Sequence, residues 1–254
     1  MAARLKDKVI VITGGTSGIG EATARRCAEE GAKIVLAGRN AEKGEALTRE
    51  LGGDATFIRT DVMREADIAA LIDQTVERFG RLDCLFNNAG AGERSSVETV
   101  TEEQFAEVMR LLVGSVVFGM KHAARVMKPQ GSGCIINNSS IAAHRINQGG
   151  YLYSGAKAAV SHLTRLAGAE LGPFGIRVNA ISPGAIATPI FWGGSARART
   201  LSDEENQQKM AKLQRNLANA TPTPRAGLAE DIANAFVFLA SDEASFINAH
   251  DLVV

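Results

Sequence analysis

The segment VIVITGGTSGIG, residues 9–20, decides the fold because it joins an apolar, β-branched run to a glycine-rich turn. The run is typical of a buried strand, and residues 21–30 after the turn have the pattern of a helix. Gly14, Gly18 and Gly20 allow a tight turn and a close approach of the backbone to a bound group. The helix N-terminus adds free N–H groups and a partial positive charge. The segment therefore predicts a site for a pyrophosphate, with a plain glycine-rich turn as the alternative interpretation.

Strands and helices alternate along the rest of the chain. Further apolar runs predict strands at 33–38, 55–60, 82–88, 133–140 and 176–182, and the sequence ends on HDLVV. Helical periodicity predicts helices at 41–51, 64–79, 102–128, 151–172, 202–219 and 229–240. Continuous apolar strands between helices are typical of a parallel sheet that is covered on both faces. We therefore expect an α/β fold of the Rossmann type over residues 1–254, a single domain with a doubly wound parallel sheet of about seven strands.

The composition excludes several classes of function. The 28 basic residues balance the 28 acidic ones and form no basic stripe, so neither nucleic acid nor an anionic membrane is an expected partner. No apolar run approaches the length of a membrane span, and the N-terminus lacks a secretory signal, so we expect a cytoplasmic protein. Cys27, Cys84 and Cys134 are widely spaced and the four histidines lack ligand spacing, so we expect reduced, buried thiols and no metal site.

A candidate reacting group begins the helix predicted at 151–172. Tyr153 and Lys157 are four residues apart, so the phenol and the ammonium share one helix face. A free tyrosine has a pKa of about 10, and we expect the lysine charge to lower it, so that Tyr153 can exchange a proton with a hydroxyl or carbonyl. Ser140, at the end of the fifth predicted strand, can orient and polarise the same oxygen. A Tyr-x-x-x-Lys pair alone is weak evidence, because many helices contain one by chance.

The Tyr153–Lys157 pair is stronger evidence for a reacting group when it is taken with other motifs. Four motifs, including this one, occur in a fixed order along the chain. They are TGGTSGIG at 13–20, NNAG at 87–90, Ser140 with Tyr153-x-x-x-Lys157, and SPG at 182–184. With these motifs the chain resembles the classical short-chain dehydrogenase/reductase family over nearly its whole length. The resemblance implies an enzyme that transfers a hydride between a nicotinamide cofactor and a small-molecule secondary alcohol or ketone. It also implies a homotetramer or homodimer that packs through long helices and the last strand.

The same resemblance implies which residues bind the cofactor. Asn87 would support the sheet beside the cofactor cleft, Asp61 would face the adenine, and Lys157 would hold the nicotinamide ribose hydroxyls. The expected cofactor contacts are Gly14, Thr16, Ser17, Gly18, Ile19, Gly20, Arg39, Asp61, Val62, Asn88, Ala89, Gly90, Tyr153, Lys157, Pro183, Gly184, Ile186 and Thr188.

The end of the second predicted strand distinguishes NAD from NADP. A carboxylate at this position would accept a hydrogen bond from the ribose 2′-OH of NAD, whereas this chain has Gly38-Arg39. A guanidinium fork suits the 2′-phosphate of NADP. We therefore expect NADP, and NAD stays possible because a solvated Arg39 stacked on the adenine would tolerate it.

Leu112 departs from the family pattern. The family usually has an asparagine in the helix after NNAG, and no asparagine occurs here between Asn88 and Asn137. A hypothesis from a different class follows, in which the chain is a catalytically impaired cofactor-binding sensor or partner subunit. The intact serine, tyrosine and lysine favour the enzyme. The family also usually continues past the last strand with Asp-Gly-Gly, whereas this sequence ends at Val254.

Residues 183–201 are rich in glycine and proline and are expected to form a loop over the C-terminal edge of the sheet. Residues 189–225, which begin within this loop, are expected to form a lid over the substrate. Phe191 and Trp192 either line a roomy apolar pocket or pin the lid to the core. The first interpretation suits a cyclic, aromatic or otherwise bulky alcohol or ketone. His144 and Gln148, between Ser140 and Tyr153, either contact a polar substituent of the substrate or lie on the surface.

Overall fold

A computed structural model describes residues 3–198, 200–219, 221 and 223–254. These residues form one parallel sheet of seven strands in the order β3-β2-β1-β4-β5-β6-β7. The strands are β1 (Val9–Thr13), β2 (Lys33–Gly38), β3 (Thr56–Arg59), β4 (Cys84–Asn87), β5 (Gly133–Asn138), β6 (Ile176–Ser182) and β7 (Asp251–Val253). The strand order reverses beside β1, which is the topological switch point where such folds bind ligands. The predicted doubly wound Rossmann-type sheet is confirmed.

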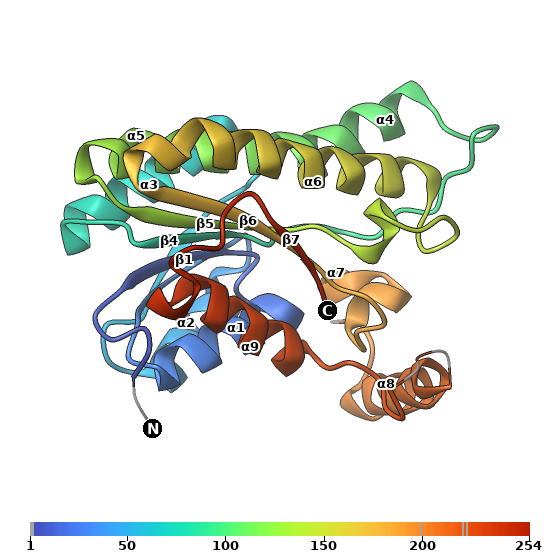
Figure 1. The fold of residues 1–254 in the computed structure, drawn as a ribbon. Coiled ribbons are helices and arrows are strands. Elements are labelled where there is room, and N and C mark those ends of the chain that lie inside the picture. The colour runs from blue at the N-terminus through green and yellow to red at the C-terminus, as the bar shows by residue number, and fades with distance from the viewer. Residues whose placement is uncertain (1–2, 199, 220, 222) are drawn as a thin grey trace.

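Helices cover both faces of the sheet (Figure 1). One face carries α1 (Gly18–Glu29), α2 (Ala41–Leu51) and α9 (Ala229–Ala240), and the other carries α3 (Glu65–Phe79), α4 (Glu102–Met109), α5 (Ser115–Gln130) and α6 (Tyr151–Leu171). Alternate residues of β1 enter two separate buried clusters, Ile10 and Ile12 on one face and Val11 on the other. Because side chains alternate across a strand, a strand that is buried on both faces needs the continuous apolar run that the sequence shows.

The long helix predicted at 102–128 is divided, which corrects the prediction. A π-helical turn, Arg110–Gly114, separates α4 from α5. Within this turn the N–H of Ser115 donates to the carbonyl oxygen of Arg110, five residues earlier. A π-turn inserts one residue and so shifts the helical phase, but Leu111, Leu112 and Val113 are all apolar and hide that shift in the sequence. The predicted strands at 55–60, 82–88 and 133–140 are each one or two residues too long at their ends.

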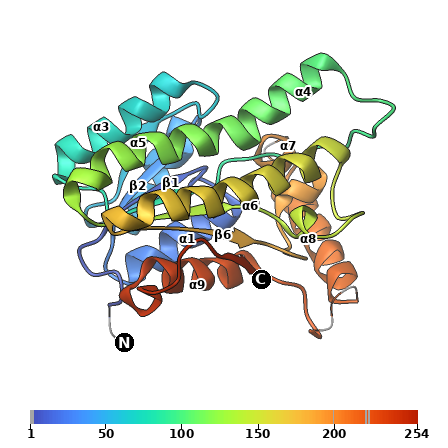
Figure 2. The same cartoon turned by 45° about the horizontal axis from the view of Figure 1, so that its top comes forward.

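The segment predicted as a loop at 183–201 contains helical turns, which is a second correction. Pro189–Trp192 is a 3₁₀ turn, α7 (Gly194–Ala198) follows it, and α8 (Asp203–Ala218) continues the predicted lid. Three positions of that lid, 199, 220 and 222, lie outside the described residues. Figure 1 and Figure 2 show α7 and α8 on the same side of the molecule, with α8 set apart from the helices that cover the two faces of the sheet. The segment predicted as a lid therefore contains short helices rather than irregular chain alone.

Candidate active site

The glycine turn between β1 and α1 requires its glycines. Gly14 and Gly18 have φ angles of 64° and 54°, in the left-handed region that favours glycine. A Cβ on Gly20 would lie 2.2 Å from the carbonyl oxygen of Gly14. Ser17 precedes α1, and within the described chain its hydroxyl caps no helical N–H. The first turn of α1 therefore keeps free N–H groups that can bind an anion, beside the predicted contacts Thr16 and Ile19.

Asn88, which follows β4, holds the glycine turn in place through hydrogen bonds of its side chain. Its carboxamide donates to the carbonyl oxygens of Thr13 and Gly14, at 3.0 and 3.2 Å. The Thr13 hydroxyl in turn accepts from the N–H groups of Asn88 and Ala89, at 3.0 and 3.1 Å. The Asn138 carboxamide donates to Asn88 Oδ1 at 2.9 Å. The side chain of Asn88 therefore positions the glycine turn. This role is independent of the predicted contact between Asn88 and a cofactor.

Asn87, one residue earlier, lies inside the sheet layer. It is 4% exposed and donates to Asn137 Oδ1 at 2.8 Å. Asn137 in turn donates to the hydroxyl of Thr164 on α6, at 2.9 Å. This buried polar chain ties β4 and β5 to the helix that carries the candidate reacting residues.

Ser140, Tyr153 and Lys157 come together at the carboxyl end of β5. Ser140 follows the strand, Tyr153 lies in the first turn of α6, and Lys157 lies one turn further on. Lys157 Nζ is 5.6 Å from the centroid of the Tyr153 ring and donates to the carbonyl oxygen of Asn138 at 2.6 Å. Ser140 and Lys157 are only 8% and 5% exposed. The three side chains therefore occupy one largely buried site.

The electrostatics of this site differ from the prediction. Burial raises the pKa of Tyr153, and a hydrogen bond from the Ser140 hydroxyl partly offsets that rise. Burial also lowers the pKa of Lys157 to about 8. The predicted lowering of the Tyr153 pKa by Lys157 is therefore wrong for the polypeptide itself. The physical reason is that a buried, poorly solvated site destabilises the charged form of each group, the phenolate of Tyr153 and the ammonium of Lys157.

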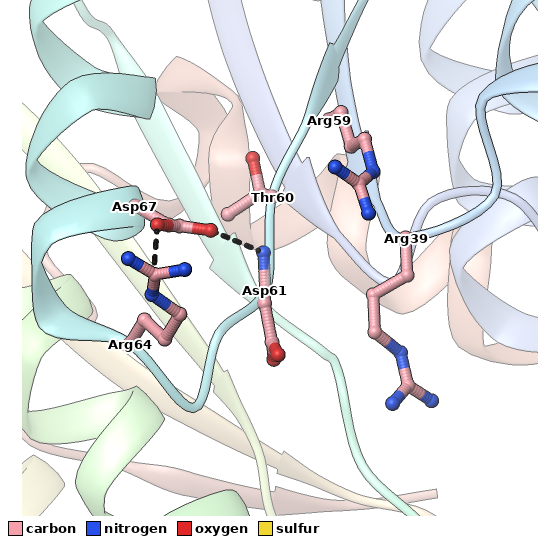
Figure 3. Close-up of a pocket in the computed structure, with 6 residues that line it drawn as sticks. All are labelled: Arg39, Arg59, Thr60, Asp61, Arg64 and Asp67. Atoms are coloured by element: carbon pink, nitrogen blue, oxygen red, sulfur yellow. Dashed lines mark hydrogen bonds and ion pairs between the residues drawn. The ribbon is translucent and has the colours of Figure 1, made fainter.

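A pocket of about 240 Å³ lies beyond the ends of β2 and β3 (Figure 3). The predicted residues Arg39 and Asp61 both line it, while Val62 is 8% exposed and belongs to the core. Arg59 and Arg64 also line the pocket. Neither arginine was predicted, because no motif marks Arg64 and because the register that places Arg59 beside β2 cannot be seen in the sequence.

The loop after β6 lies against the segment that follows Ser140. The Ile141 N–H donates to the carbonyl oxygen of Pro183 at 2.9 Å, and the Gly184 N–H donates to that of Val254 at 2.8 Å. Ile186 and Thr188 are 5% and 7% exposed. The predicted nicotinamide-end contacts therefore sit next to the candidate reacting residues.

His144, a predicted substrate contact, forms hydrogen bonds with residues of β6 and β7. Its Nε2 lies 3.0 Å from Asp251 Oδ2 and 3.2 Å from Ser182 Oγ. The Ser182 hydroxyl also donates to Asp251 Oδ1 at 2.6 Å. This cluster ties the loop after β5 to the last two strands, which favours a structural role for His144. Gln148 is exposed, in line with the surface interpretation.

The loop after NNAG contacts both α6 and the segment predicted as a lid. The Glu93 carboxylate accepts from the backbone N–H of Tyr153 at 3.2 Å. Arg94 Nη2 donates to the carbonyl oxygen of Phe191 at 3.1 Å. The Phe191 side chain is 42% exposed, and the indole N–H of Trp192 is buried without a hydrogen-bond partner among the described residues. Glu93 was not predicted as a site residue, since no motif marks it.

Leu112 lies in the π-helical turn and packs against the NNAG segment. It is 2% exposed, and its Cδ2 is 3.2 Å from the position of a Cβ built on Gly90. Leucine therefore fills this position as an ordinary core residue.

Three further expectations from the sequence concern thiols, metal ligands and membrane spans. Cys27, Cys84 and Cys134 are buried, free thiols, as expected. Across the described ranges, no three His, Cys, Asp or Glu side chains gather as a metal site would require. In the same ranges we find no helix with the length and apolarity needed to span a membrane.

Comparison with known proteins identifies the family. The family model described as enoyl-(acyl carrier protein) reductase matches residues 14–254. Levodione reductase from Leifsonia aquatica is 40% identical over 254 residues, 97% of this chain and 92% of the relative. Tropinone reductase-like 1 from Erythroxylum coca is 40% identical over 255 residues, 99% of this chain and 90% of the relative. A solved 3-ketoacyl-(acyl-carrier-protein) reductase from Brucella melitensis, complexed with NADH, matches with a TM-score of 0.87 at 30% identity, over 98% of this chain and 97% of that one. The chain therefore belongs to the classical short-chain dehydrogenase/reductase family, and it is an NAD(P)-dependent oxidoreductase that acts on CH–OH and C=O groups.

Proposed function

We propose that the protein transfers a hydride between NADP(H) and a bulky secondary alcohol or ketone, with Ser140, Tyr153 and Lys157 as the reacting group. The observation that carries this proposal is the meeting of these side chains at the carboxyl end of β5. The described residues fit a nicotinamide dinucleotide, because a Cβ built on Gly18 meets no protein atom within 4 Å and because α1 keeps free N–H groups beside that open space. When bound, the cofactor supplies or accepts the hydride.

The side chains handle the proton. In the reductive direction Tyr153 donates its phenolic proton to the carbonyl oxygen as carbon gains the hydride, and in oxidation it takes the proton back. The Ser140 hydroxyl donates a hydrogen bond to the same oxygen and stabilises its developing charge. The Lys157 ammonium holds the ribose hydroxyls of the cofactor, and it attracts the phenolate that forms when the proton leaves, although burial still keeps the pKa of Tyr153 above its ordinary value. Burial of Tyr153 and Lys157 strengthens these interactions, because little water competes for them.

A spectrophotometric assay tests the reaction class. The purified protein is offered NADPH with a panel of cyclic and aromatic ketones, and NADP⁺ with the matching secondary alcohols. Absorbance of the reduced nicotinamide is then followed over time. We expect turnover with a subset of the panel. Tight cofactor binding without turnover on any member would instead favour the cofactor-binding sensor, the alternative that Leu112 motivates.

Arg39 supports a preference for NADP over NAD, because it lines the pocket near the end of β2, where Gly38 carries no carboxylate. One charge-assisted pairing contributes about 1.5–3 kcal/mol, which corresponds to a preference of about tenfold or more. Titration of the wild-type protein with each oxidised cofactor measures the two dissociation constants. Tighter binding of NAD⁺ than of NADP⁺ would contradict the preference.

We propose in addition that residues 189–225 act as a substrate lid and that the chain forms a homodimer or homotetramer. The Arg94–Phe191 hydrogen bond supports the lid, since it fastens this segment next to the candidate site. Exposed apolar side chains on the helical layer, Phe105 at 52% and Leu166 at 48%, support packing between copies. Light scattering on the purified protein measures the oligomeric state, and a monomer would contradict that part of the proposal.

A further inference from the structure

Arg59 and Arg39 come from different strands but line the same pocket (Figure 3). In the parallel pairing of β2 and β3, Arg59 lies directly beside Gly38, and Arg39 follows Gly38 in the chain. The geometry points to Arg59 as a second arginine that binds the 2′-phosphate of NADP(H), together with Arg39. This inference rests on the proposed preference for NADP.

The face of the sheet on which Arg59 lies supports the assignment. A Cβ built on Gly38 would lie 3.4 Å from the Thr16 hydroxyl and 3.9 Å from the ring of Phe57. Arg59 follows Phe57 by two residues in β3, so both side chains leave the strand on one face, the face of the glycine turn. Arg59 is exposed to solvent. Since Gly38 has no side chain, space remains between the glycine turn and Arg59.

The two carboxylates that line the pocket, Asp61 and Asp67, form contacts with groups other than Arg39 and Arg59. Asp67 accepts from the Asp61 N–H at 3.1 Å and lies 3.4 Å from Arg64, and Figure 3 shows both contacts. Asp61 accepts from the Met63 N–H at 3.1 Å. Both carboxylates therefore already have partners.

In the described part of the chain, by contrast, neither Arg39 nor Arg59 has a carboxylate within the 4.0 Å of an ion pair. Two like charges in one pocket repel each other, and a phosphate dianion that binds both relieves the repulsion. The 2′-OH of NAD carries no charge, so it neither forms ion pairs with the two arginines nor relieves their repulsion. Arg59 therefore contributes to cofactor choice rather than to binding of the shared dinucleotide.

Binding titrations on single variants of the full chain test this role. Dissociation constants for NADP⁺ and NAD⁺ are measured for the wild type, Arg59→Ala, Arg59→Gln and Arg39→Ala. Arg49→Ala, on the exposed end of α2 and outside the pocket, controls for the loss of one positive charge. Adenosine 2′-monophosphate and adenosine 5′-monophosphate serve as competitors that isolate the phosphate. Thermal melting checks that each variant is folded.

We expect Arg59→Ala and Arg59→Gln to weaken NADP⁺ and adenosine 2′-monophosphate at least fivefold, while binding of NAD⁺ and adenosine 5′-monophosphate changes less than twofold. Arg49→Ala should change none of the four. If only Arg39→Ala weakens NADP⁺, the role of Arg59 is wrong and the NADP preference stands. Equal weakening of NADP⁺ and NAD⁺ by Arg59→Ala also contradicts the role. If the wild type binds NAD⁺ more tightly, the proposed preference itself fails.

Discussion

The carboxylate of Glu93 accepts a hydrogen bond from the backbone N–H of Tyr153 at 3.2 Å, across 60 residues of sequence. Gly150, the residue before α6, has no side chain with which to cap that helix. Tyr151 donates its N–H to the carbonyl oxygen of Ser95, so a second contact comes from the same loop. The loop after NNAG therefore supplies the cap for the helical turn that carries the candidate acid/base.

Removal of this cap is expected to slow catalysis. Loss of a helix cap costs about 0.5–2 kcal/mol, and here the cost falls on the turn that positions the Tyr153 phenol. We expect Glu93→Ala to lower kcat by about tenfold, and to leave the dissociation constant of the cofactor within about twofold. Glu93→Gln keeps an acceptor oxygen and should recover most of the loss. Equal kcat values for the wild type and Glu93→Ala would show that Tyr153 needs no such support.

Tyr153→Phe should nearly abolish turnover and leave cofactor binding close to normal. Phenylalanine keeps the ring but has no proton to exchange. Lys157→Ala should weaken both turnover and cofactor binding, because the proposed role of the ammonium covers both. Steady-state rates and cofactor titrations on the two variants separate these effects. If Tyr153→Phe kept most of its activity, another group would have to be the acid/base.

The low pKa of Lys157 predicts a pH-dependent stability. Burial lowers that pKa from 10.5 to about 8, so between these values the unfolded chain binds more protons than the folded one. The contribution of Lys157 to the free energy of unfolding therefore rises with pH across that window. The raised pKa of Tyr153 has the opposite effect above its ordinary value of 10.0, where the unfolded chain loses that proton first.

Urea denaturation of the wild type and of Lys157→Met at several pH values measures the contribution of the lysine. We expect the free energy of unfolding of the wild type, minus that of Lys157→Met, to increase by about 2 kcal/mol from pH 8 to pH 10. Methionine is similar in length and does not titrate. Parallel curves for the two proteins would mean that Lys157 has an ordinary pKa in the folded state.

Leu112→Asn should change the turnover number by less than about tenfold, equivalent to about 1.4 kcal/mol of barrier. Leucine forms no hydrogen bond through its side chain. The π-turn around it already departs from regular helical hydrogen bonding, and such turns leave backbone carbonyls for water. We therefore expect an ordered water near Lys157 Nζ in a high-resolution crystal structure with cofactor. A hundredfold gain from Leu112→Asn would instead identify the natural chain as an impaired catalyst.

Local signals made the framework of the fold predictable. The apolar run at 9–13 and the glycines after it act within a few residues of each other, and the structure places a strand, a turn and a helix there. The π-turn was not predictable, because Leu111 and Leu112 extend the apolar pattern of an unbroken helix. The turns at 189–198 were missed because glycine and proline are also typical of loops.

Long-range pairing explains what the sequence could not indicate about the site. The partner of His144, Asp251, lies 107 residues away, and nothing near either residue marks the pair. Arg59 lies beside Gly38 only through the register of β3 on β2. The pKa of Tyr153 depends on burial that is visible only in the folded chain. Residue type and spacing indicated the candidate reacting group, while its surroundings required the three-dimensional structure.

Trp192 is an intrinsic fluorescence probe for the segment in which it lies. It is the one tryptophan of the sequence, and it ends the 3₁₀ turn that Arg94 fastens through Phe191. Tryptophan emission from the intact chain therefore arises from the lid segment and not from the sheet. A shift in emission wavelength when a ligand is added would follow the environment of this indole directly. Stopped-flow fluorescence can thus test whether the environment of this segment changes before, during or after hydride transfer, without an attached dye.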